Sequence, residues 1–153
     1  MSNMILLARP HPFIVTGMKP FLEANGFSPK KLEKYSDLSA QITGASGAII
    51  SLAVESSIKE SMEQVYAEVR RVSPALPLMF AGMLGFSAMK GTLRRLAKSE
   101  GVEAELLGMD AESENHPGLG KLNTFLYISN VDLAEAGRRK LAARIVQRHF
   151  KRT

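Results

Sequence analysis

Arg9 and Pro10 stand directly after the first predicted strand, which covers residues 4–8. In many α/β proteins the turn at the carboxyl end of such a strand holds the reactive groups of the site. Neither residue offers a carboxylate, so this turn cannot bind a hard divalent cation such as Mg²⁺. We expect Arg9 to face the solvent, and the alternative is an ion pair with Asp110.

A glycine-rich segment from Thr43 to Gly47 is the second candidate site. It resembles the Thr-Gly-Ala-Ser-Gly fingerprint of short-chain dehydrogenases and of some flavoproteins, whose glycines let a pyrophosphate approach a helix N-terminus. Such a motif follows a strand and opens a helix, whereas this one precedes an apolar run, and Ile50 replaces the last glycine. We expect a turn here, with nucleotide or flavin binding as the alternative.

The histidines and the cysteine count argue against a metal centre. His11, His116 and His149 do not have the spacing of metal ligands, and the chain contains no cysteine. We expect His11 in a turn, His116 in a loop and His149 on one side of the last helix. The sequence therefore predicts no metal and no cofactor.

The last predicted helix is the most basic part of the chain. Seven Lys or Arg and no acid lie between residues 138 and 153. A solvated face is the first interpretation of this charge, and a protein-docking surface is the second. Contact with nucleic acid comes last, because interleaved aromatic rings are missing. If a partner docks here, Arg139, Arg144 and Arg148 are the candidate residues.

Length and composition indicate one globular domain. The chain has 153 residues, of which 45% are hydrophobic and 23% charged, and its net charge is +5. It has no apolar run near the roughly 18 residues that span a bilayer, and we expect no secretory leader. We expect a single domain over residues 1–153, located in the cytoplasm, with no membrane partner.

Apolar runs and helical periodicities alternate along the chain. The predicted strands cover residues 4–8, 32–35, 48–54, 76–81 and 102–107, and the predicted helices cover 13–24, 36–42, 58–72 and 86–99. Pro20 means that the first helix is kinked or that a new turn begins near Lys19. A capping box from Ser57 to Glu60 predicts the start of the third helix. This order of elements predicts an α/β fold with a parallel five-stranded sheet and helices on both faces.

The C-terminal third adds to this five-strand core. Residues 110–121 are polar and predict a loop, and residues 123–129 permit an extra edge strand. A second capping box, from Asp132 to Glu135, predicts the start of a long C-terminal helix over about residues 133–150.

Several segments resemble the receiver domain of response regulators. Many receivers begin with an apolar strand, two aspartates, His-Pro, and a helix that closes on Leu-Glu-Ala and a glycine. This chain has its own His-Pro at residues 11–12 and the sequence Phe-Leu-Glu-Ala-Asn-Gly-Phe at residues 21–27. Residues 49–53 resemble the family's third strand, and residues 70–80 its third helix and fourth strand. The resemblance covers about residues 4–109 and implies a flavodoxin-like fold.

The resemblance also implies which residues should carry the family's chemistry, and each is substituted. The metal-binding acids fall on Arg9 and Pro10, the phospho-acceptor on Ser51, the switch hydroxyl on Gly82 (or on Ala81 after a shift of one), and the conserved lysine on Gly108. A serine without an adjacent base is a poor nucleophile, so we expect no phosphotransfer and no enzyme activity.

These expectations describe an atypical pseudo-receiver in bacterial two-component signalling. It would bind a protein partner, or a second copy of itself, and would accept no phosphoryl group. In receivers the output face combines the fourth helix, the fifth strand and the fifth helix, which here implies residues 83–98 and the C-terminal segment. The alternatives are a nucleotide or flavin binder that uses Thr43 to Gly47 and a nucleic-acid-associated module that uses the last helix.

Overall fold

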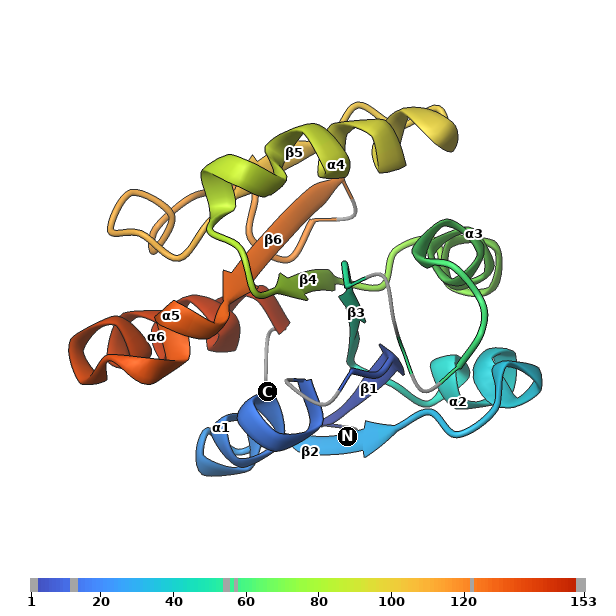
Figure 1. Ribbon diagram of the computed structural model, residues 1–153, viewed down its shortest axis with the longest axis horizontal. Coiled ribbons are helices and arrows are strands. Elements are labelled where there is room, and N and C mark those ends of the chain that lie inside the picture. Colours follow the sequence, from blue (N-terminus) through green and yellow to red (C-terminus); the bar gives the residue numbers. More distant parts are fainter. Residues whose placement is uncertain (1–2, 12–13, 54–55, 57, 122, 151–153) are drawn as a thin grey trace.

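One six-stranded, all-parallel sheet forms the centre of the molecule in a computed structural model that describes residues 3–11, 14–53, 56, 58–121 and 123–150. The strands follow the order β2-β1-β3-β4-β6-β5 (Figure 1). Their bounds are β1 (Met4–Arg9), β2 (Ser28–Lys31), β3 (Gly47–Ser51), β4 (Leu78–Gly82), β5 (Glu105–Leu107) and β6 (Thr124–Ser129). Every neighbouring pair is parallel.

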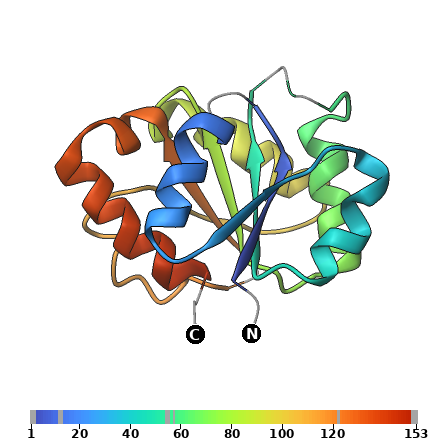
Figure 2. The ribbon, with the colours of Figure 1, turned by 90° about the horizontal axis from the view of Figure 1, so that it is seen from below.

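Helices cover both faces of the sheet. They are η1, a π-helical turn (Ile14–Met18), α1 (Lys19–Ala24), η2, a 3-10 turn (Tyr35–Asp37), α2 (Leu38–Thr43), α3 (Met62–Val72), α4 (Phe86–Ser99), α5 (Asn130–Ala134) and α6 (Ala136–Phe150). The core on one face contains side chains of α1, α5 and α6, and the core on the other contains those of α2, α3 and α4. Figure 2 shows α1 and α6 on one side of the sheet and α2 and α3 on the other.

The alternation of side chains along the strands explains both cores. In β1, Ile5 and Leu7 enter the core beneath α1 and α6, while Leu6 and Ala8 enter the core beneath α2 and α3. A parallel strand covered on both faces has to be apolar at nearly every position, and this one is. The predicted α/β, flavodoxin-like class with a C-terminal helix is therefore confirmed.

The strand at residues 123–129 was predicted at an edge and lies inside the sheet. β6 sits between β4 and β5, and all six of its residues are buried. Phe125 and Tyr127 face one core and Leu126 and Ile128 the other, so the strand needs cover on both sides. The edge position belongs instead to β5, which has only three residues and exposes Glu105.

Other boundaries shift for local reasons. β2 lies at residues 28–31 instead of 32–35, and β3 ends at Ser51. The first helix begins with the π-helical turn, and α1 starts at Lys19, so Pro20 sits in a first turn, where its missing N–H costs nothing. The second of the two options at Pro20 is thus confirmed. The predicted helix start at Phe13 and the predicted strand end at Val54 lie outside the described residues.

Both predicted capping boxes are displaced. Ser57 lies outside the described residues, and the third helix is capped by Ser61, whose Oγ accepts from the Gln64 N–H at 3.2 Å. The predicted long C-terminal helix is split, because Glu135 has an extended backbone between α5 and α6. At its start, the Asp132 carboxylate accepts the backbone N–H of Ser129, which precedes α5.

Candidate functional site

Arg9 closes the carboxyl edge of the sheet and does not face the solvent. Its side chain is buried, with 5% of the residue exposed. The guanidinium donates to the carbonyl oxygens of Ser51 at 2.9 Å, of Glu60 at 3.1 Å, and of Ala53. Burial lowers the pKa of Arg9 from its usual value, and the negative charge of Glu63 opposes that shift. The solvent-facing prediction was therefore wrong, and Arg9 holds the segment between β3 and α3.

The Asp110 carboxylate, the predicted alternative partner of Arg9, has a different role. It accepts the backbone N–H and the hydroxyl of Ser113, each at 3.0 Å. These bonds shape the segment that connects β5 to β6.

Pro10 and Ser51 also have structural partners. The carbonyl oxygen of Pro10 accepts a hydrogen bond from the Ser56 hydroxyl. The Ser51 side chain is buried, and its Oγ accepts the backbone N–H of Ala53 at 3.0 Å. A hydroxyl engaged in a turn of this kind is not poised to attack a phosphoryl donor.

Gly82 and Gly108 are small because aromatic rings lie against them. A Cβ on Gly82 would stand 2.7 Å from the Tyr127 hydroxyl oxygen, and one on Gly108 would stand 2.6 Å from the Phe86 ring. The two rings stack on each other, with centroids 6.1 Å apart and an interplanar angle of 21°. The receiver resemblance placed the switch hydroxyl at Gly82 and the lysine at Gly108. The space beside these two glycines is taken by the rings of Tyr127 and Phe86.

Tyr127 is a neutral hydrogen-bond donor in this place. Desolvation, with a smaller contribution from Asp132, raises the pKa of its phenol to about 12. The hydroxyl donates to the carbonyl oxygen of Leu84 in the segment between β4 and α4. Tyr127 therefore holds the segment after β4 by a hydrogen bond to its backbone, as Arg9 holds the segment after β3.

The sheet order separates the five predicted positions. Arg9 (the last residue of β1), Ser51 (in β3) and Gly82 (in β4) lie on neighbouring strands, and Pro10 follows Arg9. Gly108 follows β5, which is separated from β4 by β6. The strand next to β4 is β6, and the residue that follows it is Asn130. Asn130 was not among the predicted site residues, although the fully apolar stretch at 125–128 indicated a strand inside the sheet.

The described part of the chain offers no metal centre. None of its clusters of three or more His, Asp or Glu could hold a metal ion. His149 lies on the last helix, as predicted, and faces the core: its Nδ1 accepts the Gly120 N–H at 3.0 Å, and its Nε2 lies 2.6 Å from the Leu78 carbonyl oxygen. Burial lowers the pKa of His149 to about 4, so the ring is neutral at physiological pH.

The glycine-rich segment lies at the opposite, amino edge of the sheet. α2 ends at Thr43, and β3 begins at Gly47, so the segment opens a strand and not a helix. The Phe150 ring from the end of α6 occupies the space that a side chain at Gly47 would need. Gly47, the last glycine of the segment, therefore makes room for the Phe150 ring, and no helix N-terminus follows it to receive a pyrophosphate.

The three candidate arginines of α6 do not share one surface. Arg139 donates to the Leu133 carbonyl oxygen at 3.2 Å, beside α1. Arg144 forms an ion pair with Glu114 at 2.8 Å, in the segment that precedes β6. Arg139 and Arg144 are five residues apart in α6, so their side chains point in directions that differ by about 140° around the helix axis. Arg148 is exposed.

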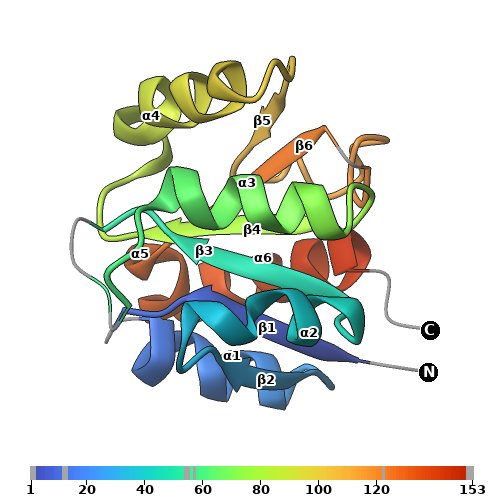
Figure 3. The ribbon, with the colours of Figure 1, turned by 90° about the vertical axis from the view of Figure 1, so that its right-hand side faces the viewer.

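Exposed apolar side chains gather at the carboxyl edge. Among the described residues, the large exposed hydrophobics are Met83, Leu84 and Val131, at 51%, 60% and 53% exposure. They follow β4 and β6, which are paired up to Gly82 and Ser129. The start of α4 and all of α5 lie at this edge in Figure 3. A cleft of about 230 Å³ adjoins Val131 and contains the ion pair of Asp132 with Arg138.

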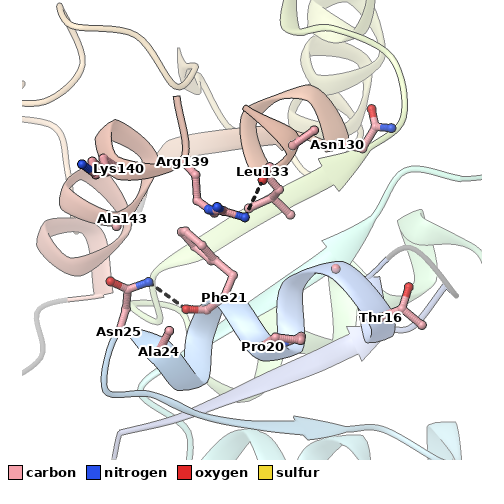
Figure 4. Close-up of a pocket in the computed structure, with 12 residues that line it drawn as sticks. Thr16, Pro20, Phe21, Ala24, Asn25, Asn130, Leu133, Arg139, Lys140 and Ala143 are labelled. Carbon is pink, nitrogen blue, oxygen red and sulfur yellow. Dashed lines mark hydrogen bonds between the residues drawn. The ribbon is translucent and has the colours of Figure 1, made fainter. Parts of the chain in front are cut away.

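A larger groove, the α1–α6 groove, runs along the neighbouring helices. Its volume is about 620 Å³; η1 and α1 form one wall, and α5 and α6 form the other. Figure 4 shows Arg139 and Phe21 pointing toward each other across it. Sequence reasoning missed this groove, since it depends on how two helices far apart in the chain are spaced.

Comparisons with known proteins found no match. No family model, no curated protein and no solved structure matches it. No helix within the described ranges combines the length and apolarity needed to cross a membrane.

Proposed function

We propose that this protein is a pseudo-receiver: a receiver-like domain that accepts no phosphoryl group and acts in bacterial signalling by binding another protein. The observation that carries the proposal is the guanidinium of Arg9, bound to the carbonyl oxygens of Ser51, Ala53 and Glu60. A cation held there by backbone oxygens leaves neither the carboxylates nor the space that Mg²⁺ and an acyl phosphate require.

The partner docks on the face made of α4, β5 and the adjoining carboxyl edge. Met83 and Leu84 precede α4 on this face, and Val131 lies beside them. Exposed apolar side chains grouped in this way are typical of interaction surfaces. Along the outer side of β5, a cleft of about 460 Å³ carries both signs of charge, from Lys90, Arg94, Glu103 and Glu105.

Exposure to a phosphoryl donor tests the first half of the proposal. Incubated with acetyl phosphate and Mg²⁺, the purified protein should gain no phosphoryl group in intact-mass spectra, and beryllofluoride should leave its amide NMR spectrum unchanged. A receiver with an intact site, handled in parallel, is the positive control. A covalent phosphoryl adduct or a Mg²⁺-dependent spectral change would refute the proposal.

Site-specific crosslinking tests the second half. A photo-reactive residue at Leu84, in the full chain expressed in its own cells, should give a discrete crosslinked product that the additional change Met83→Asp abolishes. The control position is Ala40, which is exposed on α2; this helix covers the same face of the sheet as α4 but contacts β1 and α3, whereas α4 contacts β6 (Figure 1). Products of equal yield at both positions, or none at Leu84, would contradict the docking surface. A product of twice the chain's mass identifies the partner as a second copy.

A further inference from the structure

The α1–α6 groove has the size and lining of a small-molecule site. Its volume of about 620 Å³ lies within the range of ligand pockets, which is about 300–1,000 Å³. Phe21 and Leu133 form an apolar floor, since they are 5% and 8% exposed. Small residues on both walls, among them Ala24 and Ala143, leave the space between the helices unfilled.

The charge around the groove has one sign. Arg139 and Lys140 line it, and no acidic side chain is among its described lining residues. Within the described chain, neither cation has a carboxylate within ion-pair distance, whereas Arg138 pairs with Asp132 and Arg144 with Glu114. A groove with an apolar floor and uncompensated positive charge complements an apolar anion.

Arg139 is the residue placed to recognise that anion. Its guanidinium extends from α6 over the groove toward Phe21 (Figure 4). One of its N–H groups donates to the Leu133 carbonyl oxygen at 3.2 Å, which fixes the side chain and leaves other donors available. A guanidinium held in this way binds a carboxylate through paired hydrogen bonds.

The wall opposite Arg139 has an unusual backbone. η1, which contributes Thr16 and Gly17 to the groove, is a π-helical turn. Such turns are rare, and they occur frequently at functional sites. Asn25, at the far end of α1, donates one of its two amide N–H groups to the Phe21 carbonyl oxygen at 2.7 Å.

We infer that the α1–α6 groove binds a small apolar carboxylic acid, with its hydrocarbon body on Phe21 and Leu133 and its carboxylate on Arg139. This site is separate from the proposed protein-docking surface, and neither depends on the other. Lys140 adds to the positive potential at the same end of α6.

Calorimetric titration of the full chain with dodecanoate, below its micelle concentration and at low salt, tests the inference. Dodecanoate should bind, and dodecanol and dodecylamine, which keep the chain and change the head group, should bind at least about tenfold more weakly. Absence of dodecanoate binding, or equal binding of the amine, overturns the inference.

Two pairs of variants test where the ligand sits. Arg139→Gln should weaken dodecanoate binding by about tenfold or more, whereas Arg148→Gln, the same change at an exposed position outside the groove, should not. Ala24→Trp should block the groove and abolish binding, whereas Ala111→Trp on the exposed β5–β6 segment should not. Equal effects within either pair overturn the site, and thermal unfolding of each variant verifies its fold.

Discussion

At the carboxyl edge of the sheet a buried arginine binds backbone carbonyl oxygens, whereas at the amino edge a buried histidine binds one carbonyl and one N–H. Arg9 offers only donors and serves three carbonyl oxygens. His149 accepts from Gly120 and therefore donates from Nε2 to Leu78, which requires the neutral ring. The two edges are closed by similar means, but only the amino edge depends on a group that gains a proton in acid, since the pKa of His149 in the folded protein is about 4.

The comparison also extends to the rings beside the two edges. Tyr127 lies against Gly82 at the carboxyl edge, and Phe150 lies against Gly47 at the amino edge. At both edges glycines that resemble parts of binding motifs are therefore explained by packing. An open cavity for a ligand is found beside the helices instead, in the α1–α6 groove.

Removing the arginine should have the largest effect. Arg9→Met keeps the apolar stem and should lower the free energy of unfolding by about 3 kcal/mol, because each buried carbonyl that loses its donor costs about 1–3 kcal/mol and relief of the buried charge offsets part of this. Urea unfolding measures it. Arg148→Met, at an exposed position, should change stability by less than about 0.5 kcal/mol. Similar losses for the two variants would mean that Arg9 does not close the edge.

Acid should open the amino edge. In the unfolded chain His149 takes up a proton near its ordinary pKa of 6.5, but in the folded protein only near about 4. Its contribution is therefore complete above pH 6.5 and is lost as the pH falls toward 4, by about 3 kcal/mol at most.

The matched variant is His149→Gln, whose side-chain amide does not titrate and offers an NH₂ donor group and a carbonyl acceptor. Unfolding free energies of both proteins, measured at neutral pH and at pH 4, give the difference. The variant should lose less stability in acid than the wild type. If both lose the same amount, the histidine is not the acid-sensitive group.

Overpacking at the carboxyl edge should have an intermediate effect. Gly82→Ala places a methyl group against the Tyr127 hydroxyl and should cost about 1–3 kcal/mol. In a Tyr127→Phe background the same change should cost less, since the clashing oxygen is gone, and a double-mutant cycle from urea unfolding measures the coupling. Gly44→Ala, with nothing within 4 Å of its Cβ, is the control and should be near neutral. Zero coupling would separate Gly82 from Tyr127.

The exposed ion pair between the edges should matter least. Arg144→Gln removes the bond to Glu114, and both side chains are partly in solvent. Exposed pairs contribute about 0.2–1 kcal/mol, so the free energy of unfolding should fall by less than about 1 kcal/mol. Thermal unfolding at low and high salt checks this, because the small loss should shrink as salt increases. A loss as large as that of Arg9→Met would make this surface as important as the edges.

Much of the fold could be predicted because its signals are local. The apolar runs that became β1, β3 and β4 and the periodicity of α4 depend on neighbouring residues only. The place of β6 was predicted wrongly, although Phe125 to Ile128 are apolar on both faces, which an edge strand is not. The start of α3 was predicted too early because a capping pattern at Ser57 precedes the one at Ser61 that the helix uses.

At the carboxyl edge of the sheet, the sequence predicted which chemical groups are missing but not which contacts replace them. The identities of Arg9, Ser51 and Gly82 already excluded carboxylates from those positions. That the Arg9 guanidinium fills the edge could not be foreseen, because its partners Ser51 and Glu60 lie 42 and 51 residues further along the chain. The same holds for Tyr127 and its contact with Gly82.

The sequence by itself determined the α/β alternation and the absence of carboxylates at positions 9, 10 and 51, since both follow from residue types at known positions. Tertiary structure alone decided that β6 lies inside the sheet, that Arg9 and His149 are buried, and that a groove remains between α1 and α6. These features arise when distant segments meet, and burial then gives an ordinary arginine or histidine hydrogen-bond partners that its neighbours in sequence do not supply.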